Sequence, residues 1–259
     1  MPDQRTYLLI DISNSFTKVA LASTDRIRRR KNVATAKFSA GFLRTFVRSR
    51  AIDLVVVSSV VPGKNREIRR GAGRTKILWL GSRIKLGVGV EYPDPKSIGA
   101  DRLANAAAVA ALYGCPAIVV DFGTAVTFDI VSQERNYVGG VIAPGLEAMT
   151  TFLYQRTALL PRISLREPRR AVGKSTVEAM TAGAVFGYRG LVREIIQRIK
   201  AERFPKRNVH VIATGGYARL ISKRVPAIGK VHPDLTLEGL RIVANLNSSG
   251  HDLRRRTGR

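Results

Sequence analysis

The sequence predicts an α/β protein made of two like halves. An apolar run that enters a short polar turn and resumes as a second apolar run occurs twice, at 7–21 and at 117–131. Each of these hairpins opens roughly half of the chain. The continuous Leu-Val-Val-Val run within Asp53 to Val60 is typical of a strand buried on both faces of a parallel sheet. Helices and strands then alternate, so the order β-β-β-α-β-α-β is expected in each half.

The first half, 1–114, is predicted to form the N-terminal domain. After its opening hairpin, the expected elements are a strand near Val33 to Phe38, a helix over Ala40 to Ser49, the strand Asp53 to Val60, a basic helix opening at Pro62, a short strand at Lys76 to Leu80 and an alanine-rich helix at Ile98 to Tyr113. Alanine has the highest helix propensity, which favours the last of these helices.

The second half, 115–247, is predicted to form the C-terminal domain, and 248–259 a basic, frayed tail. Its expected elements are strands at Ala117 to Asp121, Val126 to Val131, Asn136 to Ile142 and Val209 to Ala213, a short helix after Gly145, and helices at Thr176 to Arg203 and Leu237 to Leu246. The segment Gly173 to Thr176 resembles the end of a Walker A loop, but that motif also needs a glycine where Pro168 stands. We instead expect a helix start capped by Ser175 or Thr176.

Composition indicates a globular protein from a reducing compartment. A chain of 259 residues with 45% hydrophobic content can bury one large core or two modest ones. Cys115 is the lone cysteine, which excludes an internal disulfide, and the three histidines lack metal-ligand spacing. No apolar run approaches membrane-spanning length and the N-terminus lacks signal-peptide features, so a cytoplasmic protein is expected.

The formal net charge of +25 raises the question of a nucleic-acid partner. The basic residues fall into separate groups, at 26–31, 64–76, 166–170 and 254–259, without interleaved aromatic residues on which bases could stack. No helix-turn-helix or zinc-finger pattern accompanies them. We therefore expect a solvated basic surface that retains polyanions nonspecifically at low salt, with no specific nucleic acid and no membrane as partner.

Two turns combine a carboxylate with small polar residues. Asp121 precedes Gly123-Thr124 in the second hairpin, and Asp11 precedes Ser13-Asn14-Ser15 in the first. A loop of small residues lets backbone N–H groups approach an anion, while the carboxylate suits a cation or a water. One such turn can arise for purely local reasons. Two at matching positions indicate a phosphate-plus-metal site in two like domains that face each other across a cleft.

A third constellation is Gly99-Ala100-Asp101-Arg102, where a proline-rich loop meets the alanine-rich helix. One interpretation is that Asp101 complements the positive end of the helix dipole. That interpretation leaves Arg102 unexplained, because the dipole disfavours a cation there. An adjacent Asp and Arg also suit a substrate with a hydroxyl to deprotonate and a carboxylate to bind. Both interpretations stay open on these residues alone.

Taken together, the motifs resemble those of type III pantothenate kinases, of the actin-like, sugar-kinase and heat-shock-ATPase superfamily. The resemblance covers 7 to about 246, and its motifs occur in the family's order: Asp11-x-x-Asn14-x-x-x-Lys18, Gly99-x-Asp101-Arg102, Asp121-x-Gly123-Thr124-Ala125-x-Thr127, Gly139-Gly140-x-Ile142-x-Pro144-Gly145 and Thr214-Gly215-Gly216. It implies two duplicated actin-like ATPase (ribonuclease H-like) domains around a cleft. It also implies ATP-dependent phosphorylation of pantothenate to 4′-phosphopantothenate, the first step of coenzyme A biosynthesis, by a homodimer using ATP with Mg²⁺ and a monovalent cation, K⁺ or NH₄⁺.

The resemblance assigns roles motif by motif. It implies that ATP is bound by Asp11, Ile12, Ser13, Asn14, Ser15, Phe16, Thr17, Lys18 and Thr124. Asp11 would lie near the magnesium ion, Asp121 would hold the monovalent cation, and Asp101 would be the proton acceptor. Pantothenate would be bound by Tyr92, Gly99, Ala100, Asp101, Arg102 and Thr176.

One position departs from the family pattern. Ser13 stands where the family has glycine, which matters if the backbone there has positive φ or touches phosphate. If either condition holds, Ser13 would weaken ATP binding or abolish catalysis. The alternatives are a catalytically weak or regulatory relative of the same fold, a superfamily kinase for another hydroxyl acid, and a basic nucleic-acid-binding protein that carries this fold.

Overall fold

The computed structural model describes residues 5–48 and 50–248. Contacts divide them into two compact units. The first unit comprises 5–48, 50–113, 135–137 and 234–248. The second unit comprises 114–134 and 138–233. The basic tail predicted at 248–259 lies, from 249 on, outside the described residues.

A five-stranded mixed sheet forms the centre of the first unit. Its order is β3-β2-β1-β4-β5, with the bounds β1 (Tyr7–Ile12), β2 (Phe16–Ala22), β3 (Ile27–Ala34), β4 (Leu54–Ser59) and β5 (Ile77–Trp79). β1 pairs antiparallel with β2 and parallel with β4. All six residues of β1 are buried, as expected for a central strand covered on both faces.

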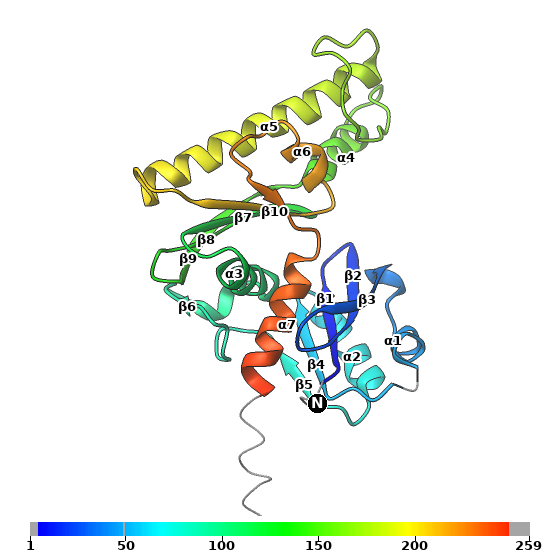
Figure 1. Ribbon diagram of the computed structural model, residues 1–259. Helices are drawn as coiled ribbons and strands as arrows, with labels where there is room; N and C mark the ends of the chain where they lie inside the picture. Colours follow the sequence, from blue (N-terminus) through cyan, green and yellow to red (C-terminus); the bar gives the residue numbers. More distant parts are fainter. Residues whose placement is uncertain (1–4, 49, 249–259) are drawn as a thin grey trace, which may run out of the picture. The chain divides into compact units, whose positions relative to one another are not determined.

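Helices cover both faces of this sheet (Figure 1). Leu43 of α1 (Ala40–Val47) and Ile68 of α2 (Asn65–Ala72) join Leu8 and Ile10 of β1 in one apolar core. The opposite face carries α7 (Leu235–Ser248), which packs along α3 (Ala100–Leu112). A Cβ on Gly239 would meet the Ala104 carbonyl oxygen at 2.0 Å, so this close helix contact requires glycine.

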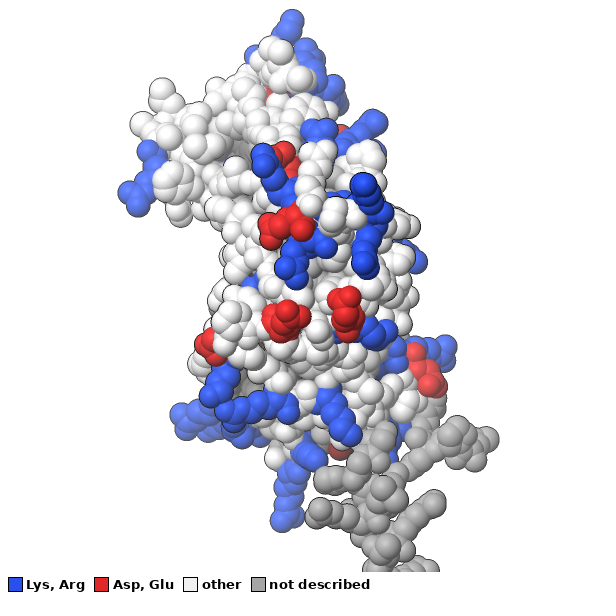
Figure 2. Space-filling model, turned by 90° about the vertical axis from the view of Figure 1, so that its left-hand side faces the viewer, with Lys and Arg blue, Asp and Glu red and all other residues white. Residues whose placement is uncertain are grey.

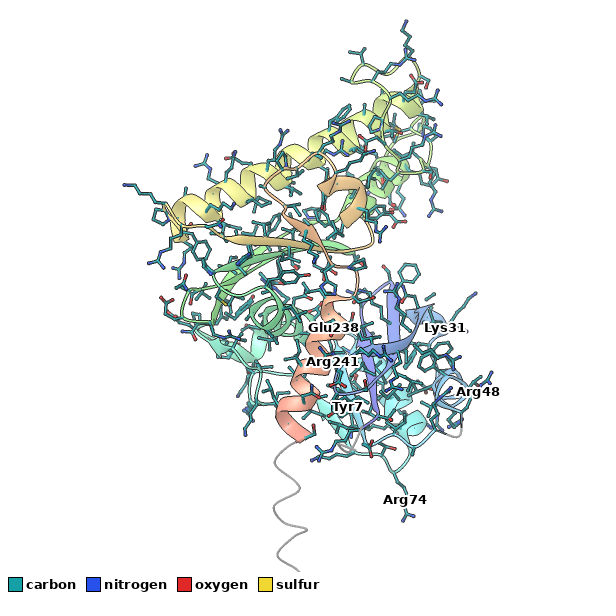
Figure 3. The ribbon with its side chains drawn as sticks, in the orientation of Figure 1. Tyr7, Lys31, Arg48, Arg74, Glu238 and Arg241 are labelled. Atoms are coloured by element: carbon teal, nitrogen blue, oxygen red, sulfur yellow. The ribbon has the colours of Figure 1, made fainter. Side chains whose placement is uncertain are left out.

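Helix α7 is also fixed by polar contacts that involve Tyr7, Glu238 and Arg241, which are labelled in Figure 3. Arg241 Nε donates to Glu238 Oε2 at 2.7 Å, and the Arg241 guanidinium also donates to the Thr24 carbonyl oxygen. At the far end, Ser248 Oγ lies 2.9 Å from Tyr7 Oη of β1. The last helix therefore belongs with the first unit, whereas the sequence assigned it to the C-terminal domain.

The second sheet has the order β11-β10-β7-β8-β9-β6. Its strands are β6 (Gly89–Val90), β7 (Ala117–Phe122), β8 (Ala125–Val131), β9 (Asn136–Pro144), β10 (His210–Gly215) and β11 (Lys230–Val231). The helices of the second unit are α4 (Leu146–Arg156), α5 (Thr176–Arg203) and α6 (Ala218–Ser222). Tyr188, Val192 and Ile196 of α5 are buried in the core of the second unit. Strand β6 pairs with the first residues of β9, which group with the first unit.

Two sequence predictions need correction, and three short elements were not predicted. The third strand begins at Ile27 instead of Val33, and Thr35–Lys37 is a 3₁₀ turn. Its Arg-rich sequence is typical of a solvated segment, but an edge strand tolerates charged residues and gains protection from them. Ser248, expected in the frayed tail, is the last residue of α7. The two-residue strands β6 and β11 and the short α6 were missed because such short segments show no hydrophobic periodicity in the sequence.

Among the described residues, none of the helices combines the length and the apolar character that a membrane span requires.

Candidate functional site

The first predicted phosphate loop is the turn between β1 and β2. Asp11 pairs with Lys18 across this hairpin, and its side chain is 3% exposed. The Ser13 N–H donates to the Phe16 carbonyl oxygen at 3.1 Å, which closes the turn. Among the described residues, the non-glycine positions with positive φ are Arg48, Arg135 and Lys206. Ser13 therefore carries no left-handed backbone strain, so the first of the two conditions for weak ATP binding is not met.

Thr35, which the sequence analysis did not single out, binds the first loop through hydrogen bonds to three of its residues. Its Oγ1 donates to the Ser13 carbonyl oxygen at 2.7 Å and lies 3.0 Å from Thr17 Oγ1. Its N–H donates to the Ser15 carbonyl oxygen at 3.0 Å. Because these bonds engage both sides of the turn, they fix the loop against the 3₁₀ turn that follows β3. The signal for Thr35 is spatial and has no counterpart in local sequence.

The second predicted phosphate loop is the turn between β7 and β8 in the second unit. Asp121 pairs with Thr127 across the hairpin, and the Gly123 N–H donates to the Ala125 carbonyl oxygen at 3.0 Å. Thr124 stands at the tip. Asp121 Oδ1 lies 3.9 Å from the position that a Cβ on Gly123 would take. The carboxylate thus lies beside the small-residue turn, as the sequence predicts.

Two glycines from elsewhere in the second unit close around this turn. Gly145, the N-cap of α4, donates its N–H to the Thr124 carbonyl oxygen at 3.1 Å. A Cβ on Gly145 would lie 2.2 Å from that oxygen. Gly215, at the end of β10, has φ +91°, and its Cβ would lie 2.6 Å from the Phe122 backbone. Glycine is therefore required at both positions.

A cavity of about 290 Å³ lies in the second unit. It is lined by Glu147, Thr150, Thr151, Arg162, Ile163, Ser164, Leu165 and Tyr217. Tyr217 Oη donates to Glu147 Oε2 at 3.2 Å. Burial, and then the Glu147 carboxylate, raise the pKa of the Tyr217 phenol above its ordinary value, which favours the protonated form that donates this hydrogen bond. Tyr217 follows Gly216, whose N–H donates to the Phe122 carbonyl oxygen at 3.0 Å, which links the cavity to the second loop.

In the first unit, α3 begins as the sequence predicts. Gly99 is the N-cap, and Ala100 is the first helical residue. The Asp101 carboxylate turns back over the cap: its Oδ1 accepts the Arg102 N–H at 2.9 Å and would meet a Cβ on Gly99 at 2.6 Å. Glycine at 99 thus leaves room for this carboxylate to stand at the helix terminus.

Arg102 extends from α3 to an aromatic pair. Its guanidinium carbon lies 5.7 Å from the centroid of the Tyr137 ring. Tyr92 meets the same ring edge to face, with centroids 6.2 Å apart. Tyr137 is fully buried, whereas Tyr92 is 38% exposed. The structure therefore brings Tyr92, Asp101 and Arg102 to one part of the first unit, and adds Tyr137.

Thr176 lies in the second unit, as the first residue of α5. Ser175 is the cap, and its Oγ accepts the Glu178 N–H at 3.2 Å, while Glu178 Oε2 accepts the Lys174 N–H at 2.8 Å. The Ser175 cap confirms the predicted helix start, and Glu178 adds a bond to the residue before the cap. The role of Thr176 in binding substrate stays a prediction.

The carboxylates do not form a metal cage. In the described part of the chain, no three His, Cys, Asp or Glu residues gather in a way that could hold a metal ion. Magnesium in phosphoryl-transfer sites is usually held by one or two carboxylates together with substrate phosphates and water. A buried Asp11 beside the first predicted phosphate loop fits that mode of binding.

The family model and the relatives of known sequence that match this chain name the same family. The family model described as type III pantothenate kinase matches residues 7–198. A type III pantothenate kinase of Akkermansia muciniphila is 49% identical over 93% of this chain and 99% of its own length. One from Methylacidiphilum infernorum is 40% identical over 92% of this chain and 88% of its own.

Solved structures of lower identity share the fold. A candidate 2-dehydro-3-deoxygalactonokinase from Sinorhizobium meliloti is 14% identical with a TM-score of 0.57, covering 92% of this chain and 98% of its own. The inorganic polyphosphate/ATP-glucomannokinase of Arthrobacter sp. strain KM is 12% identical with a TM-score of 0.50, covering 93% and 99%.

Proposed function

This chain belongs to the type III pantothenate kinase family, and we infer that it phosphorylates pantothenate with ATP, the first step of coenzyme A biosynthesis. The observation that carries this inference is the family match over 7–198, which includes both phosphate loops and the Gly99 to Arg102 segment. The family implies ATP with a divalent metal ion as the phosphoryl donor.

The two domains are proposed to be duplicates of one actin-like fold. Support comes from strand order: β3-β2-β1-β4-β5 in one sheet corresponds to β9-β8-β7-β10-β11 in the other. In both, the first strand pairs antiparallel with the second and parallel with the fourth, so the Asp11 and Asp121 turns occupy equivalent positions. The predicted cleft between the domains stays a prediction.

The first loop, Asp11 to Lys18, is proposed to bind the phosphates of ATP. Lys18 would neutralise phosphate charge, and Asp11 would face the magnesium ion, which lowers the charge on the transferred phosphoryl group when bound. The three hydrogen bonds from Thr35 support this role, because a fixed loop can hold its N–H groups toward phosphate without reorganising.

In the second loop, Thr124 is proposed to donate to phosphate and Asp121 to hold the monovalent cation, K⁺ or NH₄⁺. The enclosure of this turn by Gly145 and Gly215 supports both roles, because it leaves the tip little freedom. The cavity beside Tyr217 would receive the adenosine portion of ATP, with the Glu147 carboxylate available to the ribose hydroxyls.

Pantothenate is proposed to bind at the start of α3 in the first unit. Arg102 would pair with the substrate carboxylate, since a guanidinium binds a carboxylate through two parallel hydrogen bonds. Tyr92, Gly99 and Ala100 would line the site. Tyr137 would act as a positioning residue, because its buried ring supports the Arg102 guanidinium.

Asp101 is proposed as the general base. Its carboxylate would accept the proton of the primary hydroxyl as that oxygen forms its bond to the γ-phosphorus and the bond to the β-phosphate oxygen breaks. ADP leaves with the electron pair of the broken bond. Phosphoryl transfer requires mainly alignment and charge neutralisation, which Arg102, Lys18 and the loop N–H groups supply.

A homodimer is proposed from an exposed apolar face on α4, α5 and the segment between them. Large apolar side chains are exposed there at Met149, Phe152, Leu153, Tyr154, Leu159, Val172, Val177 and Phe186. Several exposed large apolar side chains on neighbouring segments favour a protein interface. Thr176 lies next to Val177, so a second copy seated on this face would lie beside it.

A cytoplasmic location is proposed as well. The lone Cys115 suits a reducing compartment, where disulfides are rare. Both substrates of the proposed reaction are small soluble anions.

The proposed function is tested by release of ADP. ADP should form in a mixture of enzyme, ATP, Mg²⁺, K⁺ and pantothenate, and release should fall to background when pantothenate is omitted. An equal rate without pantothenate would indicate an ATPase, and no rate in either mixture would indicate a non-catalytic relative.

A further inference from the structure

Basic side chains are widespread, but they are concentrated in one part of the first unit. They outnumber acidic ones on the face drawn in Figure 2, as expected for 44 Lys and Arg against 19 Asp and Glu. Between positions 26 and 85 stand seventeen of these basic residues and two acidic ones, Asp53 and Glu67. Local repulsion on that scale opposes folding, so a partner of opposite charge would relieve it.

Helices α1 and α2 arrange part of this charge in two rows. Arg66, Arg69 and Arg70 of α2 are spaced i, i+3 and i+4, which places them on one helix face. Arg44 and Arg48 stand four residues apart at the end of α1. All five side chains are exposed, while the apolar residues Leu43 and Ile68 of the two helices are buried.

The edge strand β3 adds two further cations to the same side of the sheet. The Arg29 guanidinium carbon lies 4.8 Å from the Phe46 ring centroid, and Lys31 Nζ lies 5.5 Å from that of Phe42. Both rings belong to α1. Arg69 is likewise 5.2 Å from the Trp79 ring of β5. Cation–π contacts such as these orient the long side chains without neutralising their charge.

The one acidic residue in β3, α1 and α2, all of which are fully described, is engaged internally. Glu67 Oε2 accepts the Ala40 N–H at 2.8 Å, at the start of α1. Its other oxygen lies 3.9 Å from Arg70. Arg44 donates to the Arg70 carbonyl oxygen at 3.3 Å, and a Cβ on Gly71 would meet Leu43 at 2.8 Å, so the two helices pack in direct contact. The basic side chains are therefore attached to two helices that are packed firmly against each other.

We propose that Arg29, Lys31, Arg44, Arg48, Arg66, Arg69, Arg70 and Arg74 form a surface that binds the phosphate backbone of nucleic acid without reading its sequence. This set is called the α1–α2 basic surface. Seven of its eight members are arginine, whose planar fork matches phosphate oxygens through paired hydrogen bonds. Figure 3 shows Lys31, Arg48 and Arg74 directed away from the ribbon of the first unit.

The α1–α2 basic surface favours nucleic acid over a lipid membrane as its partner, because it lacks exposed large apolar side chains. Among the described residues between 26 and 85, no large hydrophobic side chain is exposed. Peripheral membrane segments combine cations with apolar side chains that enter the acyl boundary. A purely ionic surface instead matches the phosphate contacts that dominate nonspecific nucleic-acid affinity. The surface contains none of the residues proposed for ATP or pantothenate, so binding would be independent of catalysis.

The test compares two triple variants with the same change in charge. Arg48→Gln/Arg66→Gln/Arg74→Gln removes three side chains of the surface that make no hydrogen bond or ion pair in the described structure. Arg166→Gln/Arg169→Gln/Arg170→Gln removes three exposed arginines of the second unit as the control. Affinity for a fluorescein-labelled 20-nucleotide RNA and a 20-base-pair DNA duplex is measured by anisotropy from 50 to 300 mM KCl.

The surface variant should flatten the slope of log affinity against log salt by about 3 for the DNA duplex and about 2 for the single-stranded RNA, since each phosphate contact contributes about 0.9 on a duplex and about 0.7 on a single strand. The control should keep the wild-type slope, and both variants should keep wild-type kinase rates. If the triple variant unfolds, the single variants Arg66→Gln and Arg74→Gln replace it in the test. Each should lower the slope on the DNA duplex by about 0.9. Equal losses in both triple variants would overturn the proposal, because net charge alone would then explain binding. Retention on phosphatidylserine vesicles without affinity for either nucleic acid would overturn it in favour of a membrane.

Discussion

The guanidinium of Arg102 lies over the ring of Tyr137, 5.7 Å from guanidinium carbon to ring centroid, although 35 positions separate them in the chain. Tyr137 pairs with Val90 of β6, and its carbonyl oxygen accepts the N–H of Glu91, the residue after β6, at 2.9 Å. The next residue, Tyr92, packs on the same ring. A two-residue strand pairing thus fixes the arginine that we propose for the substrate carboxylate.

Replacing this arginine by lysine should weaken pantothenate binding. Arg102→Lys keeps the charge but loses the planar fork and the stacking on Tyr137. The KM for pantothenate should rise at least tenfold, about 1.4 kcal/mol, with a smaller change in kcat. Tyr137→Leu should raise KM in the same direction, while Tyr137→Phe, which keeps the ring, should not. Equal KM values for the Leu and Phe variants would remove Tyr137 from a positioning role.

Removing the proposed base should affect turnover more than binding. Asp101→Asn keeps the size of the side chain and an oxygen able to accept the Arg102 N–H. Pantothenate affinity by calorimetry should therefore persist, while kcat falls about 10²- to 10⁴-fold, the usual contribution of a positioned base. Wild-type turnover in this variant would return Asp101 to a helix-capping role.

The proposed cation site predicts a salt preference. If Asp121 holds a monovalent cation beside the Gly123-Thr124 turn, activity should fall when Na⁺ replaces K⁺ at constant ionic strength. Asp121→Ala should lose that preference together with most of its activity. Initial rates in matched chloride salts measure this, and identical wild-type rates in the two salts would argue against the assignment.

Ser13 should prove neutral for ATP. From the sequence alone, Ser13→Gly would be expected to tighten ATP binding up to about tenfold by relieving strain of roughly 1–3 kcal/mol. The structure removes that reason, because Ser13 lies outside the positive-φ region. ATP affinity of Ser13→Gly should then stay within about twofold of wild type. Clear tightening would mean that the Ser13 side chain crowds the phosphate.

An ion pair in the second unit should make stability depend on pH. Arg189, 3% exposed, donates to both oxygens of Glu167, at 2.9 and 2.7 Å. These hydrogen bonds hold the pKa of Glu167 below its ordinary value. The pair therefore stabilises the fold at neutral pH, and that contribution is lost as pH falls through the lowered pKa.

Glu167→Gln should lower stability at pH 7 by about 1–2 kcal/mol, a discounted figure because the Glu167 side chain is partly exposed. The difference from wild type should shrink as the pH falls through the lowered pKa of Glu167, because the wild-type carboxylate then becomes protonated and neutral like the Gln side chain. Glu194→Gln, which breaks an exposed pair with Arg198, is the control and should change the unfolding midpoint little. A Glu167→Gln deficit that stays constant over the whole acid range in which wild-type stability falls would contradict an electrostatic origin.

The sequence predicted most of the elements because their signals are local. The hairpins, the buried β4 and the capped start of α5 each show their period or cap within a few residues. Thr35 and Tyr137 were missed because their roles depend on contacts between segments distant in the chain. The same holds for α7, whose place in the first unit follows from Gly239 against Ala104 and Arg241 against Thr24.

The most direct test of the central claim is the identity of the product. After incubation with ATP, Mg²⁺ and K⁺, mass spectrometry should show pantothenate gaining one phosphoryl group, and ³¹P NMR should show a phosphate monoester on its primary hydroxyl. The product should appear in a one-to-one ratio with ADP and be strongly reduced with Asp101→Asn. ADP formation without phosphorylated pantothenate, or equal product from the Asp101→Asn enzyme, would contradict the account.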